Sequence, residues 1–92
     1  MNILKRNDQR FLELLHKEIL KHNFDKEKAF IDKKIIFKEL EFSKSTFWLS
    51  SKHLIESDLI EEKRILNHNS FISIFRLTDR GFKLCEILKY SN

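Results

Sequence analysis

Two stretches of the chain combine basic and hydroxyl side chains and contain no acidic residue. The first is Phe42–Ile55 and the second is Lys63–Thr78. Ammonium, guanidinium, imidazole and hydroxyl groups attract a polyanion and donate hydrogen bonds to phosphates and base edges, so these stretches could bind double-stranded DNA. The candidate DNA-contacting residues are Lys44, Ser45, Thr46, Trp48, Lys52, His53, Lys63, Arg64, His68, Asn69 and Arg76.

In the first stretch, these roles have structural alternatives. Small residues such as Ser45 and Ser50 would let a helix backbone approach a DNA groove, although serine is also common on solvated helices; Ser51 should pack between crossing helices. Trp48 could contact thymine methyl groups or sugars, or could flank the core or a protein interface. Leu49 should be exposed, and beside Trp48 it could mark a protein contact.

The second stretch could place its basic side chains on phosphates or in the minor groove. The alternative is a solvated hairpin, in which Arg76 pairs with a carboxylate. Acid-free stretches of this length also arise by chance, so charge patterning alone is a modest signal. The signal gains weight because each stretch lies on an element that could face DNA, a helix for the first stretch and a hairpin for the second.

The pattern gives no support for catalysis or a metal. The histidines at positions 16, 22, 53 and 68 fall on different expected elements, at spacings that match no metal motif. The single cysteine, Cys85, excludes an internal disulfide and lies on an inward stripe, where a buried thiol is a small apolar residue. We therefore expect neither an enzyme nor a cofactor.

The composition predicts one small globular domain spanning residues 1–92. The chain is 41% hydrophobic and 35% charged, with a formal net charge of +4 and a pI of about 9.3. A mild positive charge of this kind is compatible with DNA as a partner but is shared by many proteins that bind none. No apolar run approaches the roughly 20 residues of a membrane span, so we expect a cytoplasmic protein with no membrane partner.

Hydrophobic periodicity predicts two helices before the first acid-free stretch. Residues 7–22 should form a helix capped by Asn7 and ended by Asn23 in the left-handed conformation. Its apolar stripe is wider than one contact requires, which indicates either a central helix touched on two sides or a dimer contact. Residues 28–31 could form a short strand that pairs with a later hairpin. Asp32 should cap a second helix over residues 33–41, and Ser43 a third.

Two strands and a last helix should follow. Residues 59–66 and 71–77 are typical of strands, and the turn cluster at residues 67–70 predicts a hairpin. Period-2 alternation places Phe71, Phe75 and Leu77 on its core face, with Ile72 and Ile74 on the other. Residues 79–90 should form the last helix, capped by Thr78.

This order of elements, and two local sequences, resemble the winged helix-turn-helix proteins. SKSTFWLSSKHLIESDLIEE (residues 43–62) is similar to their recognition helix and first wing strand, and IFRLTDRGFKL (residues 74–84) to their second wing strand and the Leu-Thr-x-x-Gly start of the last helix. MarR-like and small archaeal-type transcriptional regulators are the nearest groups. Glu41-Phe42 stands where the family has a small turn residue, and Asp58 where it has glycine.

The resemblance implies an α+β, mainly α fold with a three-helix core, a helix-turn-helix at about 33–57, a wing at about 59–77 and a C-terminal helix at about 79–90. The implied function is sequence-specific binding of double-stranded DNA by a transcriptional regulator. Helix 43–57 would lie in the major groove and the 63–76 wing on the backbone or minor groove. A homodimer would form through the first and last helices. The alternative is a protein-binding module that uses Trp48, Leu49, Ile72 and Ile74.

Overall fold

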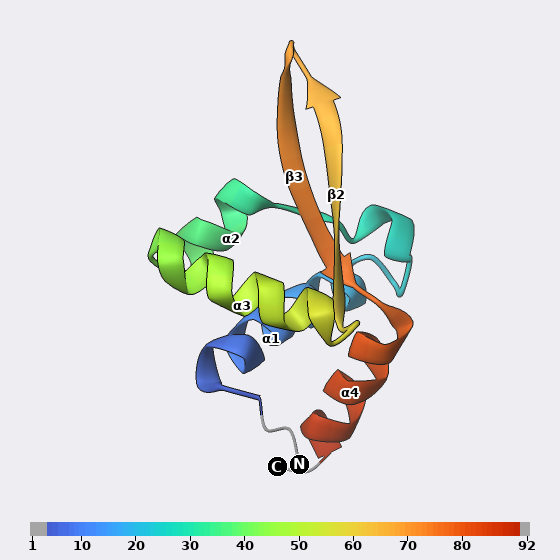
Figure 1. Cartoon of the computed structure of the whole chain (residues 1–92). Coiled ribbons are helices and arrows are strands. Elements are labelled where there is room, and N and C mark those ends of the chain that lie inside the picture. The colour runs from blue at the N-terminus through green and yellow to red at the C-terminus, as the bar shows by residue number, and fades with distance from the viewer. Residues whose placement is uncertain (1–3, 91–92) are drawn as a thin grey trace.

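The computed structural model describes residues 4–90, with the side chains of all of these except Lys26, Lys89 and Tyr90. Within this range the chain forms an α+β, mainly helical fold (Figure 1). Its α-helices are α1 (Arg6–Lys21), α2 (Lys33–Leu40), α3 (Lys44–Glu56) and α4 (Asp79–Tyr90). Its strands are β1 (Ile31–Asp32), β2 (Ile60–Asn67) and β3 (Ser70–Leu77), and a short 3-10 helix, η1 (Lys26–Lys28), precedes β1.

The three strands form one antiparallel sheet in the order β1-β3-β2. The β1 strand is only two residues long and pairs Ile31 with Phe75 and Asp32 with Ile74. It therefore supports only the base of the hairpin, and the outer half of β2 and β3 projects beyond the helices as a two-stranded arm (Figure 1). A strand that pairs with β3 confirms the expectation for this region, although it begins at Ile31 rather than at residue 28.

Helix α1 lies at the centre of the core. Phe11 and Leu15 are fully buried, and α1 contacts α2, α3, α4 and β3. The Phe11 ring centroid lies 5.5 Å from that of Phe47 on α3 and 6.0 Å from that of Phe75 on β3. Burying such rings stabilises the fold by about 1.5–3 kcal/mol each. Most of the wide stripe of α1 is thus occupied by contacts within one chain, as expected of a central helix, whereas Leu20 stays 37% exposed.

Three of the four expected helix caps, Asp32, Ser43 and Thr78, are present, and the fourth, Asn7, is wrong. Asp32 accepts a hydrogen bond from the Lys34 N–H at 2.8 Å, and Ser43 accepts one from the Thr46 N–H at 3.2 Å. Asn7 does not cap α1, because the helix begins one residue before it. The Asp8 carboxylate instead accepts a bond from the Lys5 N–H at 3.3 Å, so a side chain inside the first turn satisfies the free backbone donor.

Residues other than glycine make the left-handed turns of this chain. Asn23 has φ 56° after α1 as predicted, and Glu41 has φ 54° at the end of α2. Asp58, where the resemblance implied a glycine, has φ 58°. His68 and Asn69 both have positive φ, at 49° and 67°. Two consecutive left-handed residues give the type of two-residue turn whose twist matches a β-hairpin.

The single glycine allows α4 to pack directly on the chain that leaves α3. A Cβ at Gly81 would lie 2.0 Å from the carbonyl oxygen of Leu59. The Thr78 hydroxyl donates to the Asp58 carbonyl at 2.6 Å and accepts from the Gly81 N–H at 3.0 Å. The Thr-x-x-Gly sequence therefore joins the end of α3, the base of the hairpin and the start of α4.

One expected core position of the hairpin is wrong. Phe75 and Leu77 are buried as predicted, but Phe71 is 64% exposed. Alternation assigned Phe71 to the correct face of β3, yet it lies on the projecting half of the hairpin, beyond the reach of β1 and the helices. A side chain on the inward face is buried only where something packs against that face.

Candidate nucleic-acid interface

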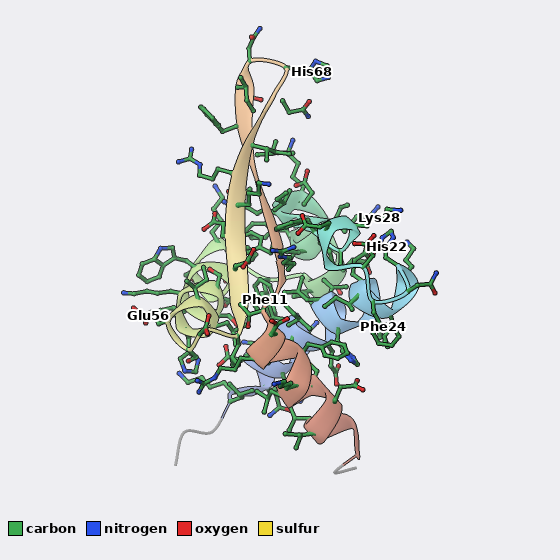
Figure 2. The ribbon with its side chains drawn as sticks, turned by 90° about the vertical axis from the view of Figure 1, so that its right-hand side faces the viewer. Phe11, His22, Phe24, Lys28, Glu56 and His68 are labelled. Atoms are coloured by element: carbon green, nitrogen blue, oxygen red, sulfur yellow. The ribbon has the colours of Figure 1, made fainter. Side chains whose placement is uncertain are left out.

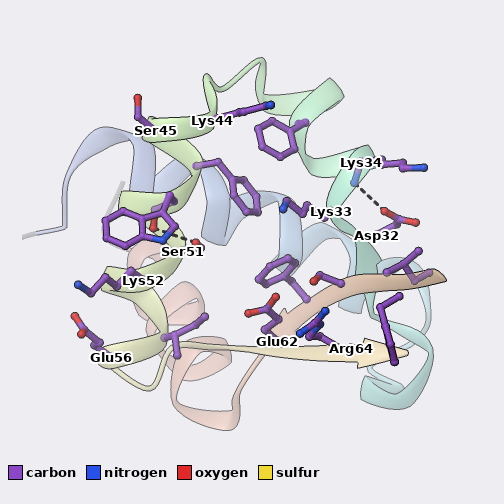
Figure 3. A pocket seen from close by; sticks show the side chains of 18 residues that line it. Asp32, Lys33, Lys34, Lys44, Ser45, Ser51, Lys52, Glu56, Glu62 and Arg64 are labelled. Carbon is purple, nitrogen blue, oxygen red and sulfur yellow. Dashed lines mark hydrogen bonds between the residues drawn. The ribbon is translucent and has the colours of Figure 1, made fainter. Parts of the chain in front are cut away.

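A groove of about 1310 Å³ lies between α2, α3 and one face of the hairpin (Figure 3). Basic residues line it on all three elements: Lys33, Lys34, Lys44, Lys52 and Arg64. Fewer acidic residues line it: Asp32, Glu56 and Glu62. The groove therefore carries a surplus of positive charge, and one oxygen of its Asp32 carboxylate is occupied by the cap of α2.

Helix α3 is held from behind by a buried carboxylate of α1. Asp8 is only 2% exposed. Its oxygens accept a hydrogen bond from the Ser50 hydroxyl at 2.6 Å and lie 2.7 Å from His53 Nδ1. Since Ser50 and His53 are neighbours on one side of α3, this contact fixes which side of the helix faces solvent.

One expectation about α3 is therefore wrong, and a second, the DNA contact of His53, stays a prediction with one ring nitrogen already engaged. Ser50 does not open the helix surface to a DNA groove, because it is buried against Asp8. His53 is half-buried, and its Nδ1 is engaged by the same carboxylate rather than free to reach a base. Ser51 is buried, as its predicted packing between helices requires. Its hydroxyl donates a hydrogen bond to the Trp48 carbonyl at 3.2 Å.

The first turn of α3 presents Lys44 and Ser45 to solvent at the rim of the groove (Figure 3). Thr46 is half-buried, and its hydroxyl accepts a hydrogen bond from Ser43 at 2.9 Å. This turn lacks acidic residues, so the positive end of the helix dipole is not neutralised there.

Further along α3, Trp48 and Lys52 form a pair on the groove side. Trp48 is 58% exposed, so its expected role as a flank of the core is wrong, whereas a role in an interface remains a prediction. The Lys52 ammonium lies 4.8 Å from the centroid of the Trp48 ring. Leu49 is 60% exposed, as predicted.

The two faces of the hairpin carry different chemistry. Cross-strand partners share a face, so Glu62, Arg64 and Leu66 of β2 lie on the same face as Phe75, Ser73 and Phe71 of β3. This is the face that borders the groove, and Arg64 is the basic residue on it (Figure 3).

Lys63 and Arg76 lie on the opposite face and do not join the groove. The Arg76 guanidinium lies 4.5 Å from the Phe30 ring and forms ion pairs with Glu61 at 2.8 Å and Glu27 at 3.2 Å. The Lys63 ammonium lies 5.7 Å from the same ring. Arg76 thus has the carboxylate-bound role that was its structural alternative, and these two predicted contacts do not lie with Lys44 and Lys52.

His68 and Asn69 form the exposed tip of the hairpin, far from the helices (Figure 2). Of the predicted residues, the groove thus brings together Lys44, Ser45, Trp48, Lys52 and Arg64. Sequence reasoning missed Lys33 and Lys34, which line the groove from the first turn of α2. Their position in the sequence could have identified them, because both directly follow the Asp32 cap in the first turn of the helix that precedes α3.

Other reactive side chains are engaged elsewhere. Burial, followed by the charges of Glu13 and Glu86, raises the pKa of the Cys85 thiol to about 12. His16 pairs with Glu86 at 2.7 Å and His22 with Glu18 at 3.0 Å. Among the described side chains no cluster of histidine, cysteine and carboxylate groups could hold a metal ion. In residues 4–90 no helix combines the length and apolar character needed to cross a bilayer.

A solved structure has a similar fold. The crystal structure of AF1382 from Archaeoglobus fulgidus matches with a TM-score of 0.73 and 23% sequence identity, over 96% of this chain and 86% of that one. At this identity the likeness shows the fold alone. A scan against protein-family models and a search of curated proteins found no match.

Proposed function

We propose that this protein binds double-stranded DNA as a winged helix-turn-helix transcriptional regulator. Helices α2 and α3 with their short connection are the helix-turn-helix, and the β2–β3 hairpin is the wing. The observation that carries the proposal is that Lys44, Lys52 and Arg64, from the two acid-free stretches, line the same groove. A groove with basic residues on several walls suits a polyanion that contacts all of them at once.

In this proposal α3 enters the major groove. The exposed first turn, with Lys44 and Ser45, meets a phosphate or base edge, helped by the positive end of the helix dipole. Lys52 moves from the Trp48 ring to a phosphate, and Trp48 is then free to contact thymine methyl groups. Arg64 and the tip residues His68 and Asn69 contact the backbone or the minor groove.

The predicted homodimer through α1 and α4 remains part of the proposal. Among the described side chains of these helices, Leu20 on α1 and Ile87 on α4 are large, apolar and exposed. A two-fold dimer would present two copies of α3 to half-sites about 34 Å apart.

A protein-binding module is the second candidate, because Trp48 and Leu49 are adjacent, apolar and both more than half exposed. Ile72 and Ile74, its other predicted contacts, are only half-exposed and contribute less. The two candidates differ in their response to salt.

The test is fluorescence anisotropy of a labelled mixed-sequence duplex at 50 and 200 mM salt. Contact with about five phosphates predicts that the Kd rises by roughly several hundredfold between the two concentrations. No binding at micromolar protein in 50 mM salt would favour the protein-binding candidate instead.

A further inference from the structure

Two large apolar side chains are exposed side by side near the tip of the hairpin. Leu66 of β2 is 65% exposed and Phe71 of β3 is 64% exposed, and the two are direct cross-strand partners. Opposite residues on adjacent antiparallel strands have their Cβ atoms about 4.5–5.5 Å apart. They therefore form one continuous apolar surface rather than two scattered residues.

A cation lies directly beside this surface. The Arg64 guanidinium carbon lies 5.3 Å from the centroid of the Phe71 ring. The hairpin from Lys63 to Thr78 contains no acidic residue, and His68 lies at its tip. An apolar pair beside the Arg64 guanidinium fits a partner that is apolar inside and anionic outside, which describes stacked base pairs between phosphate backbones.

The position of the pair favours DNA over a lipid surface. Phe71 lines the same groove as Lys44 and Lys52, and Leu66 shares its face of the hairpin. The pair therefore lies on the face of the hairpin that borders the groove, the same groove that Lys44 and Lys52 of α3 line. A duplex that contacts α3 would run directly under the pair.

The shape of the hairpin also suits insertion. The short β1 strand pairs with β3 only at Ile74 and Phe75, so the segment from Leu66 to Phe71 extends beyond the third strand (Figure 1). The tight His68-Asn69 turn keeps this arm only two strands wide.

We propose that Leu66 and Phe71 act as an apolar wedge, which inserts from the minor groove between two base pairs of the bound duplex, unstacks that step and bends the DNA. The proposal rests on the proposed function. Apolar side chains inserted in this way kink a duplex by about 20–90°. Because unstacking costs least at flexible pyrimidine–purine steps, the wedge would also favour such steps at positions that no polar side chain reads.

The test compares an intact duplex of about 30 base pairs with the same duplex carrying one central mismatch, in which part of the unstacking cost is already met. Affinity is measured by anisotropy and bending by energy transfer between dyes at the two ends. The wild-type protein should bind the mismatched duplex about tenfold more tightly and bring the ends of both duplexes closer together.

Leu66→Ser with Phe71→Ser should reduce the affinity ratio to about one and abolish the bend. Leu66→Met with Phe71→Leu keeps the pair apolar and should retain both effects. Both double variants change exposed residues, so thermal unfolding should be similar and serves as the folding control.

Each other outcome overturns the wedge in a different way. Salt-sensitive binding of both duplexes with equal affinity and no bend would overturn the wedge but leave the proposed function standing. Binding of neither duplex would overturn both. Binding of anionic phosphatidylserine vesicles that is lost in the serine variant, with no discrimination between the duplexes, would assign the pair to a lipid surface.

Discussion

His53 Nδ1 on α3 lies 2.7 Å from the buried carboxylate of Asp8 on α1. The same carboxylate accepts hydrogen bonds from Ser50 and from the Lys5 backbone. A single acidic side chain thus completes the first turn of α1 and orients α3, so the direction in which Lys44 and Lys52 point depends on a residue with no place in the groove itself.

Asp8→Ala should therefore destabilise the protein. The substitution leaves the Ser50 hydroxyl and one imidazole nitrogen without their buried partner, and it removes the acceptor for the Lys5 N–H. We expect a loss of about 2–4 kcal/mol in the free energy of unfolding, measured by urea denaturation. Glu39→Ala, at an exposed position of α2, is the control and should change the stability by less than about 0.5 kcal/mol. Equal effects would mean that the Asp8 contacts add nothing to stability.

Gly81→Ala should be among the most damaging single-methyl additions. The new Cβ would overlap the Leu59 carbonyl oxygen, which is backbone and cannot rotate away. We expect a loss of at least about 2–3 kcal/mol, seen as a lower Tm. Arg80→Ala, at the exposed neighbouring position of α4, is the matched control. An unchanged Tm for Gly81→Ala would show that α4 does not pack this closely on Leu59.

Substitutions on the two faces of the hairpin should have different effects on DNA binding and stability. Arg64→Ala removes a cation from the groove and should lower the salt slope of DNA binding by about one, with little effect on stability. Arg76→Ala breaks ion pairs with Glu61 and Glu27 on the other face and should mainly lower stability, by about 1–2 kcal/mol. Anisotropy and urea denaturation of both variants check this prediction. A larger loss of DNA affinity in Arg76→Ala than in Arg64→Ala would contradict the assignment of faces.

Cys85 should be chemically inert in the folded protein. With its pKa raised from 9.0 to about 12, the thiol holds its proton at pH 8, where only the thiolate reacts. The shift of three pH units lowers the thiolate fraction by about a thousandfold, and burial hinders access further. Labelling with a thiol reagent at pH 8 should be slow in buffer and fast in concentrated urea. The raised pKa also means that stability falls as pH rises above about 9, because only the unfolded chain then loses the proton. Fast labelling in buffer would contradict the buried position.

Local patterns in the sequence were enough to predict the four α-helices and the hairpin, but not the 3-10 helix η1. Each helix cap and turn depends on a few neighbouring residues, as with Asp32 and Ser43, whose side chains bond backbone groups two or three residues away. The α+β class and the pairing of a short early strand with the hairpin also followed from pattern.

The composition of the groove could not be predicted in the same way. The Asp8–His53 contact joins residues 45 positions apart, and nothing local marks either partner. The two hairpin faces needed the register: Arg64 lies opposite Ser73 on the groove face, whereas Arg76 lies opposite Glu61 on the other. The exposure of Phe71 depends on how far the hairpin extends past β1, which periodicity does not report.

In the proposed function, the groove between α2, α3 and the hairpin is the DNA-binding surface. This assignment is tested most directly by a charge reversal inside the groove against an equal one outside it. Lys44→Glu with Lys52→Glu changes the net charge by the same amount as Lys17→Glu with Lys38→Glu, at exposed positions of α1 and α2 that do not line the groove. Anisotropy with a mixed-sequence duplex in 50 mM salt should show a Kd raised at least about 100-fold by the groove variant and only a few-fold by the control, with similar unfolding temperatures. Equal losses in the two variants, or no loss in the groove variant, would contradict the account.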